Sequence, residues 1–440
     1  MADTYFVGMR ATGDVVTNEI PGDYRAGMLR LFPNGDMPLT GLTSLMKSKK
    51  SEYHFHWWMK SFNTRRAAVT GLYSDSLLAT TYLATYPTGA SAGVNIFVKM
   101  AEDSAKIFRA GNQVLLRDAS NYALDTTGKV TNVVLNGDSS SVTVRLLETD
   151  DNDSGNSNYL GTADSPADTI LIIGNMNPQG STRPEAISRS AAEFENYTQI
   201  FRNALDLSRT VMETQFRTED PYVAAKKDTL EDHGVDIERS LLWSTMYSGT
   251  GSNGKPEYAT RGLLSWITSY GTVEDFTLDD AAAFAGKTWL QAGDQWLDEH
   301  LEEVFRYGSR ERLCFCGSGA LLGLQAIAKD VGTWNMTPKT TLWGAKVTEW
   351  TTPFGMVTFQ THPLFSYEDT NRHSMVLIEP ANLEYRYVTD TKFEPDIYYG
   401  KGGGTGLDGK QEGYLTECGL EVHFPETTGY LNGVGKDNLV

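Results

Sequence analysis

A short run of imidazole and carboxylate side chains could hold a metal ion. The two histidines of His54-Phe55-His56 are two residues apart, so a β-strand would place both on one face, together with Glu52. Imidazole nitrogens and carboxylate oxygens are common zinc ligands. The neighbouring Trp57 and Trp58 favour another interpretation, in which the histidines pack or hydrogen-bond beside aromatic rings. We therefore predict no metal and no cofactor, with the metal cluster as the alternative.

Two further motifs resemble ligand-binding loops, but each lacks a residue that the chemistry requires. The segment from Gly249 to Lys255 has the spacing of a phosphate-binding loop, yet Pro256 replaces the hydroxyl that should hold magnesium. This segment also follows a predicted helix instead of a strand. The segment from Asp150 to Gly155 begins like a calcium loop, but its twelfth position is Gly161 and not the bidentate glutamate. Both are predicted to be ordinary loops.

The residues that could support covalent or acid–base catalysis do not form a recognisable motif. Cys314 and Cys316 share one face of a predicted strand, and with Cys418 they are expected to be buried free thiols. The seven histidines are scattered, and paired carboxylates such as Glu302 and Glu303 are common in an acidic protein. We predict no enzymatic activity. A hydrolase built from dispersed residues is an alternative that would need a pocket holding carboxylates of raised pKa.

One long helix is the element most clearly predicted by the sequence. Asp220 and Pro221 form its start signal, and Ser248-Gly249 would end it, which gives a length of roughly 40 Å. Gly234 inside it suggests a bend or a close approach of another backbone, or else a tolerated glycine. We expect a spine that packs on several partners through one apolar stripe. The stripe consists of Val223, Leu230, Gly234, Ile237 and Leu241.

The rest of the chain predicts an α+β protein. Between residues 107 and 174, short apolar runs joined through Asn136-Gly137 indicate a small β-subdomain, since Asn-Gly is a strong hairpin signal. After Gly249, helices and strands alternate. The helices are expected near Leu263–Ile267, Asp279–Phe305 and Ala320–Lys329, and the strands near Leu313–Cys316, Met356–Thr361, Met375–Ile378 and Tyr414–Phe424.

The order of these pieces resembles the major capsid proteins of tailed bacteriophages, whose fold is shared with herpesviruses. The resemblance covers most of the chain, and the order of the segments carries it more than any single string. The stretch from Pro38–Leu42 through Tyr53–Trp58 resembles the start of an extended loop. Asn196–Ile200 resembles the re-entry into a peripheral domain, and the stretch from Gly413–Leu415 to Gly433-Val434 resembles the closing strands.

The resemblance implies a domain organisation and a function. The expected parts are an N-terminal arm at 1–45, an extended loop with the inserted β-subdomain at 46–190, a peripheral domain with the spine helix at 191–255, an axial domain at 256–400 and closing strands at 401–440. It also implies a structural subunit that self-assembles as hexamers and pentamers into an icosahedral shell around double-stranded DNA. Portal, scaffold and decoration proteins are the implied partners, in the virion and, during assembly, in the host cytoplasm.

The composition agrees with a shell protein that encloses DNA without binding it tightly. The chain has 440 residues and a formal net charge of −18, which argues against high-affinity nucleic-acid binding because phosphate contacts need clustered basic residues. No apolar segment is long enough for a membrane helix, and no signal peptide is visible. Local basic residues are expected to pair with acidic neighbours across subunits, or to form a solvated face. They are Lys47, Lys49, Lys50, Arg65 and Arg66.

A binding module is the main alternative to a capsid subunit. The content of Gly, Asn, Thr and Tyr and the β-subdomain would also suit a phage tail or decoration protein that binds carbohydrate. Such a protein would remain a small closed oligomer.

Overall fold

The computed structural model divides the chain into two compact units. One comprises Met1–Met59 and Glu193–Val440, and the other is the inserted segment Lys60–Ala192. The predicted arm and Lys47 lie outside the described residues. The structure describes residues 48–439 except 61–63, 118–124, 151–159, 161–166, 183–185, 215–219, 332–335, 343–344 and 397–407.

The inserted unit is an antiparallel β-structure. Its sheet has the order β3-β9-β6-β7-β8-β5-β4, and alternate residues such as Val98, Val114 and Val142 point into its core. The predicted Asn136-Gly137 hairpin is confirmed between β7 and β8, and Gly137 has a positive φ. The elements are β3 (Arg66–Ala68), β4 (Gly71–Tyr73), α2 (Tyr82–Thr85), β5 (Asn95–Met100), α3 (Glu102–Ala105), β6 (Asn112–Arg117), β7 (Asp125–Val134), β8 (Ser140–Leu146) and β9 (Thr169–Asn175).

The C-terminal part of the larger unit is built on a mixed seven-stranded sheet of order β14-β22-β19-β15-β18-β17-β16. The central strand β15 is buried on both faces, with Phe315 in the core shared with α5 and α6, and Cys314 in the core shared with α7 and α8. The strands are β14 (Thr272–Asp275), β15 (Glu311–Cys316), β16 (Met336–Leu342), β17 (Ala345–Thr351), β18 (Met356–Thr361), β19 (Met375–Ile378) and β22 (Gly429–Asn432). The helices are α6 (Leu263–Tyr270), α7 (Trp289–Phe305), α8 (Ser318–Val331) and α9 (Pro363–Tyr367).

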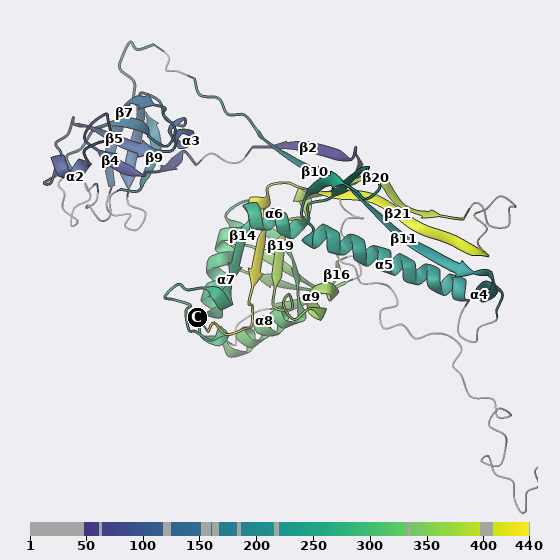
Figure 1. The fold of residues 1–440 in the computed structure, drawn as a ribbon. Helices are drawn as coiled ribbons and strands as arrows, with labels where there is room; N and C mark the ends of the chain where they lie inside the picture. Colours follow the sequence, from purple (N-terminus) through teal and green to yellow (C-terminus); the bar gives the residue numbers. More distant parts are fainter. Residues whose placement is uncertain are drawn as a thin grey trace, which may run out of the picture. The chain divides into compact units, whose positions relative to one another are not determined.

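A second sheet of the larger unit carries the long helix α5 (Pro221–Trp243). Its order is β1-β20-β21-β11, and α5 lies along β11 and β21 (Figure 1). Phe201 and Leu205 of β11 are buried, whereas Ile200 and Arg202 on the opposite face are exposed. The strands are β1 (Ser48–Lys50), β11 (Gln199–Ser208), β20 (Leu383–Glu394) and β21 (Gly409–Val422), and the short helix α4 (Arg209–Glu213) follows β11.

Two pairs of strands complete the larger unit. The chain leaves for the inserted unit through β2 (His54–Met59) and returns through β10 (Ala192–Tyr197), and these strands pair with each other. The strands β12 (Tyr247–Thr250) and β13 (Pro256–Ala259) form an antiparallel hairpin. No described helix is long and apolar enough to cross a membrane.

Two predicted helix boundaries were wrong. The long helix begins as predicted, with Asp220 accepting a hydrogen bond from the backbone of Tyr222, but it ends at Trp243, because Ser248-Gly249 belongs to strand β12 of the hairpin. The predicted helix over Asp279–Phe305 begins ten residues late, at Trp289. Thr288 and Gln291 cap this start reciprocally, which is the capping-box pattern.

Candidate functional site

The C-terminal half of α5 is anchored in a hydrophobic core. Ile237, Leu241 and Leu242 are buried there against Leu263 and Trp266 of α6. Two of the five predicted stripe residues, Ile237 and Leu241, therefore pack as predicted. This end of the helix cannot move without opening the core.

A buried polar pair ties the same half of α5 to α9. The Nε2 of His362 lies 2.8 Å from a carboxylate oxygen of Glu238, and both side chains are fully buried. The Nδ1 of His362 accepts the backbone N–H of Leu364 at the start of α9. Because Nδ1 accepts this hydrogen bond, the ring proton is on Nε2, and the Nε2–H donates a hydrogen bond to Glu238.

The N-terminal half of α5 contacts its sheet through polar side chains. His233 lies between Asn203 of β11 and Thr416 of β21, with nitrogen–oxygen distances of 2.6 and 2.7 Å. Burial lowers the pKa of His233, although the charge of Asp236 acts in the opposite direction. Nearer the start of the helix, Tyr222 donates a hydrogen bond of 2.7 Å to Glu412.

The predicted stripe was wrong for this half of the helix. Val223 is 41% exposed and Leu230 is 45% exposed, and a Cβ added to Gly234 would meet nothing within 4 Å. At about 100° per residue, the sheet-facing side of this half lies roughly a quarter turn from the stripe. The hydrophobic pattern located a real face of the helix, but the residues that the structure describes cover that face only at the C-terminal end of the helix.

The strands β2 and β10 form a ribbon with two distinct faces. Phe55, Trp57 and Met59 point into the core, and Trp57 stacks on Phe194 with a centroid distance of 6.2 Å. On the other face, His54 and His56 lie side by side, with ring centroids 4.1 Å apart.

The carboxylates beside these histidines come from β10. His54 and His56 meet Glu195 in a group whose ligand atoms all lie within 4.8 Å of one another, so Glu195 takes the place expected for Glu52. His54 stacks on Tyr197 with a centroid distance of 4.4 Å, and the ring of Tyr53 lies 6.4 Å away. Both are tyrosines, whereas the sequence suggested Trp57 and Trp58. Glu195 and Tyr197 follow His54 by about 140 residues, so no local spacing could have indicated them.

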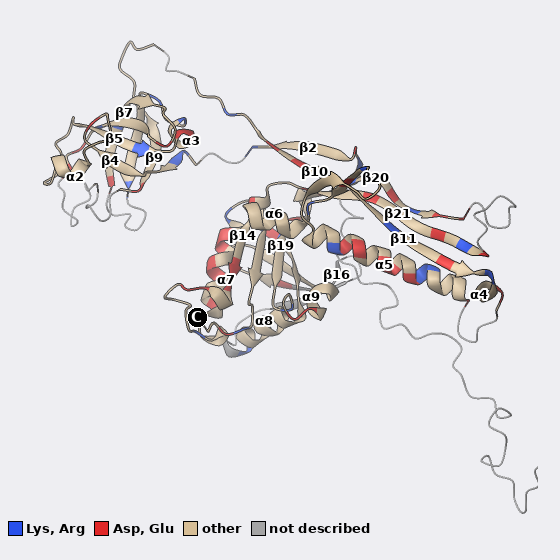
Figure 2. Cartoon of the chain, viewed as in Figure 1, with Lys and Arg blue, Asp and Glu red and all other residues tan. Residues whose placement is uncertain are grey.

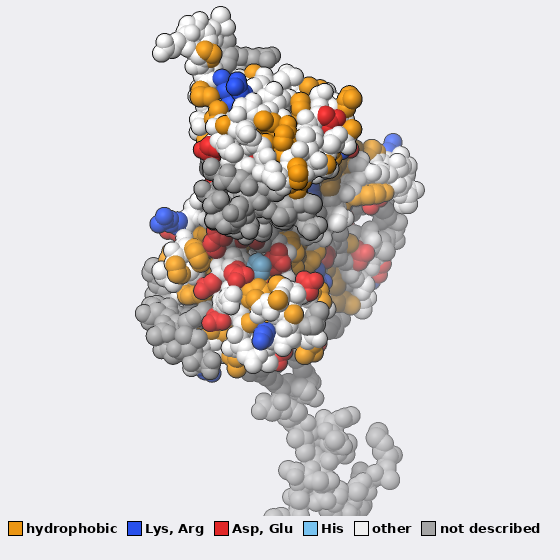
Figure 3. Space-filling model, turned by 90° about the vertical axis from the view of Figure 1, so that its left-hand side faces the viewer, with side chains coloured by type: hydrophobic (Ala, Val, Ile, Leu, Met, Phe, Trp, Pro, Cys, Tyr) orange, Lys and Arg blue, Asp and Glu red, His pale blue; other side chains and the backbone are white. Residues whose placement is uncertain are grey.

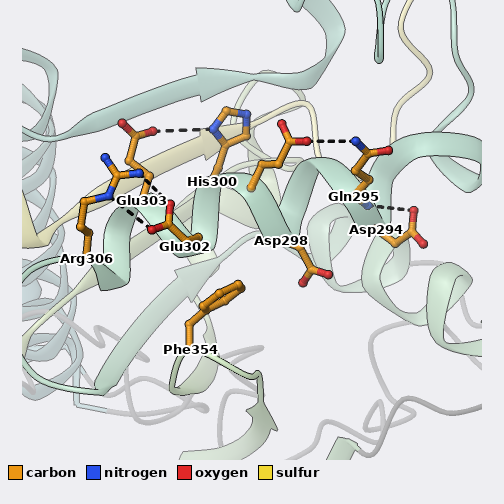
Figure 4. A pocket seen from close by; sticks show the side chains of 9 residues that line it. Asp294, Gln295, Asp298, His300, Glu302, Glu303, Arg306 and Phe354 are labelled. Carbon is orange, nitrogen blue, oxygen red and sulfur yellow. Dashed lines mark hydrogen bonds and ion pairs between the residues drawn. The ribbon is translucent and has the colours of Figure 1, made fainter. Parts of the chain in front are cut away.

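An acidic hollow of about 690 Å³ runs along α7. Figure 2 marks the acidic residues along the ribbon of α7, and Figure 3 shows acidic side chains around a histidine on this side of the molecule. In Figure 4, Glu302 pairs with Arg306 and Glu303 faces His300. Arg306 lowers the pKa of Glu302, whereas burial and the neighbouring Asp294 raise the pKa of Asp298. The hollow is an acidic surface that suits a cationic partner.

The predicted basic residues that the structure describes are divided between the two units. Lys49 and Lys50 are exposed on β1, whereas Arg65 and Arg66 belong to the inserted unit. Arg66 donates a hydrogen bond of 3.3 Å to Thr169. Their predicted role in contacts between subunits stays a prediction.

The remaining motifs have structural roles where the structure describes them. Gly249 to Lys255 runs through the β12–β13 hairpin, which is not the strand–loop–helix arrangement that a phosphate loop requires. Asp150 is buried and accepts a hydrogen bond of 2.6 Å from Tyr82. The three cysteines are buried and free, as predicted, and burial raises the pKa of Cys418 to about 12.

Sequence comparison places nearly the whole chain in one family. Residues 9–435 match the family described as SU10 major capsid protein. The major capsid protein of Pseudomonas phage PaMx41 is 23% identical over 423 residues, which cover 93% of this chain and 91% of that protein.

Two solved structures resemble part of the chain. The capsid of Myoviridae phage XM1 has a TM-score of 0.36 and 16% identity, over 59% of this chain and 81% of that one. The holo-SrpI encapsulin complex from Synechococcus elongatus PCC 7942 has a TM-score of 0.37 and 13% identity, over 56% of this chain and 76% of that one.

The family match decides between the capsid subunit and the carbohydrate-binding module considered from the sequence. It extends over both units and over the strands that connect them. The chain therefore belongs to the SU10 major capsid protein family and is a structural subunit of a phage capsid.

Proposed function

We propose that copies of this chain assemble as hexamers and pentamers into an icosahedral shell that encloses double-stranded DNA. The observation that carries the proposal is the layer formed by α5 and its sheet. The inner faces of this layer pack on each other, whereas Val223 and Leu230 on the helix and Ile200 on the sheet remain exposed. Exposed apolar side chains on both outer surfaces support contacts with other copies, because burying them removes apolar area from water.

The expected domain organisation supports the same proposal. The arm at 1–45 and the extended loop at 46–190 would reach neighbouring copies, while the peripheral parts at 191–255 and 401–440 and the axial part at 256–400 would form the body. Lys49 and Lys50, on the exposed edge strand β1, would pair with acidic surfaces of a neighbour such as the hollow on α7.

The net charge of −18 suits a container for DNA better than a sequence-specific binder. In this role the chain has no catalytic activity of its own. It would assemble in the host cytoplasm together with portal, scaffold and decoration proteins, and the virion would be its final location.

Assembly can be tested with a substitution on the exposed stripe. Wild type and Leu230→Asp are purified as full-length chains and compared by size-exclusion chromatography and negative-stain electron microscopy. Wild type should form shells, tubes or ring-shaped capsomers. Leu230→Asp should remain as folded, unassembled subunits, because a charge would have to be buried between copies.

Leu230→Met is the matched control, since it keeps an apolar side chain of similar volume, and it should assemble like wild type. Normal shells from Leu230→Asp would remove the stripe from the assembly interface. A wild-type chain that stays a small monodisperse oligomer, even with scaffold supplied, would contradict the shell itself.

A further inference from the structure

The outer face of the β2–β10 ribbon brings together two imidazoles and two carboxylates. The Nε2 of His54 lies 3.0 Å from Oε2 of Glu195, and the Nδ1 of His56 lies 3.8 Å from the same oxygen. The Nδ1 of His56 also lies 3.0 Å from Oε1 of Glu193. These contacts pair earlier residues of β2 with later residues of β10, which is the order of an antiparallel pair.

These separations are close to those of a tetrahedral metal site. With zinc–nitrogen and zinc–oxygen distances of about 2.0–2.2 Å, neighbouring ligand atoms in a tetrahedron lie about 3.3–3.5 Å apart. The observed distances of 3.0 and 3.8 Å to Glu195 lie on either side of this range. Small rotations of the side chains would therefore bring the donors around one ion.

The donor types select a class of metal. Imidazole nitrogen suits zinc, copper, nickel and iron, whereas calcium and magnesium prefer sites made of oxygen alone. Two carboxylates balance the charge of a divalent ion. Each imidazole would turn its lone pair toward the ion and carry its N–H on the other ring nitrogen, so the ion would replace the present histidine–carboxylate hydrogen bonds.

The surroundings already orient part of the site. His54 stacks on Tyr197, and Tyr197 stacks on Tyr258 at 5.0 Å, so the imidazole of His54 packs against a pair of stacked rings. The opposite face of the ribbon packs on the core through Phe55 and Trp57 of β2 and Phe194 of β10. The donors remain accessible, with 34% of the His56 side chain and 46% of the Glu195 side chain exposed.

We propose that His54, His56 and Glu195, whose ligand atoms already lie together, bind one divalent transition-metal ion of the zinc type. Glu193, which lies 3.0 Å from His56, would turn toward the ion as the fourth ligand. The ion joins β2 to β10 at the place where the chain leaves for the inserted unit and returns from it. Metal binding therefore stabilises the β2–β10 ribbon from which the inserted segment 60–192 extends. This role is additional to that of a shell subunit.

Two other His–carboxylate groups among the described residues suit a metal less well. In the group of Glu384, Glu421 and His423, Arg386 already pairs with both carboxylates. The group of Glu274, His300 and Glu303 offers a single imidazole in the acidic hollow of α7. Both provide comparison sites for the experiment.

The test is a titration of the full-length chain with Co²⁺ after treatment with EDTA and removal of the chelator. Visible absorption distinguishes four-coordinate cobalt, which absorbs strongly, from the weakly absorbing hydrated ion. Wild type should bind one Co²⁺ per chain with the four-coordinate spectrum, and Zn²⁺ should displace it. His54→Gln and His56→Gln should each weaken binding at least tenfold, because each removes a ligand.

Control variants and a second readout separate this site from others. His423→Gln and His300→Gln should bind Co²⁺ like wild type. Zn²⁺ should raise the melting temperature of wild type but not of His56→Gln, because the ion binds the folded ribbon and not the unfolded chain. Circular dichroism checks that each variant is folded.

Three results would overturn the proposal. One is a wild-type spectrum that stays that of the hydrated ion. Another is equal Co²⁺ affinity in wild type, His54→Gln and His56→Gln, which would assign binding to scattered carboxylates. The third is loss of binding in His300→Gln, which would move the site to α7. None of these measurements depends on shell assembly.

Discussion

The two halves of α5 share one helix and one apolar stripe but differ in what covers them. The C-terminal half buries Ile237 and Leu241 in the core, and Glu238 is hydrogen-bonded to His362 below the surface. The N-terminal half touches its sheet through His233 and Tyr222 and leaves Val223 and Leu230 exposed.

This difference separates two tasks along one helix. One half stabilises the folded subunit, and the other presents an apolar surface that the subunit does not need for its own core. A periodic pattern indicates that a face will be buried, but it does not indicate whether the same chain or another copy buries it. Substitutions along α5 test this separation directly.

The largest expected effect is that of Ile237→Asp, which places an unpaired carboxylate in the core. It should destabilise the subunit by on the order of 5 kcal/mol and leave little soluble folded protein. Leu230→Asp, on the exposed half, should change the free energy of unfolding by less than about 0.5 kcal/mol. Urea denaturation followed by circular dichroism gives both values, and equal losses would break the comparison.

The next effect is expected from the buried polar pair. Glu238→Ala leaves the Nε2–H of His362 buried without this acceptor and should cost about 3 kcal/mol. Asp232→Ala, at an exposed position on the same helix, is the control and should stay within about 0.5 kcal/mol of wild type. A thermal melt of Glu238→Ala that matches this control would show that the pair does not anchor the helix.

A smaller effect should appear as a pH dependence in the N-terminal half. Burial holds the pKa of His233 below its ordinary value of 6.5, so below that pH the unfolded chain takes up a proton that the folded chain does not. This contribution is fully present above pH 6.5 and is lost as the pH falls toward the lowered pKa.

The contribution of His233 can be measured from the free energy of unfolding between pH 7.5 and pH 5. His233→Gln should flatten the slope over that range, because the titrating group is gone. An unchanged slope would mean that other groups cause the pH dependence and that burial does not lower the pKa of His233.

The smallest effect should come from Gly234→Ala, and it should be stabilising. A Cβ at this position meets open space, and alanine favours a helix interior by roughly 0.5–1 kcal/mol over glycine. Chemical denaturation of the unassembled subunit measures the change. A loss of stability would contradict the open environment, whereas a more stable subunit that assembles poorly would place another copy close to Gly234.

Local signals explain which parts of the fold could be predicted. Asp220-Pro221 begins α5 and Asn136-Gly137 forms a turn because each acts through its own backbone within a few residues. The predicted end of α5 was wrong because Tyr247–Thr250, shortly after Trp243, pairs with Pro256–Ala259 as a β-hairpin. This strand pairing prevents the helix from continuing. The start of α7 could have been found from Thr288 and Gln291, a capping box that the apolar pattern obscured.

The amino-acid sequence alone determined the α+β class, the long helix and the buried thiols, because these depend on composition and periodicity. Its resemblance to known capsid proteins indicated the family, which the family match then showed. Only the tertiary structure decided that Glu193 and Glu195 meet His54 and His56, and that Leu230 is exposed while Ile237 is buried. Both outcomes depend on how distant strands pair and how a helix is rotated on its sheet. These are long-range choices that no local pattern encodes.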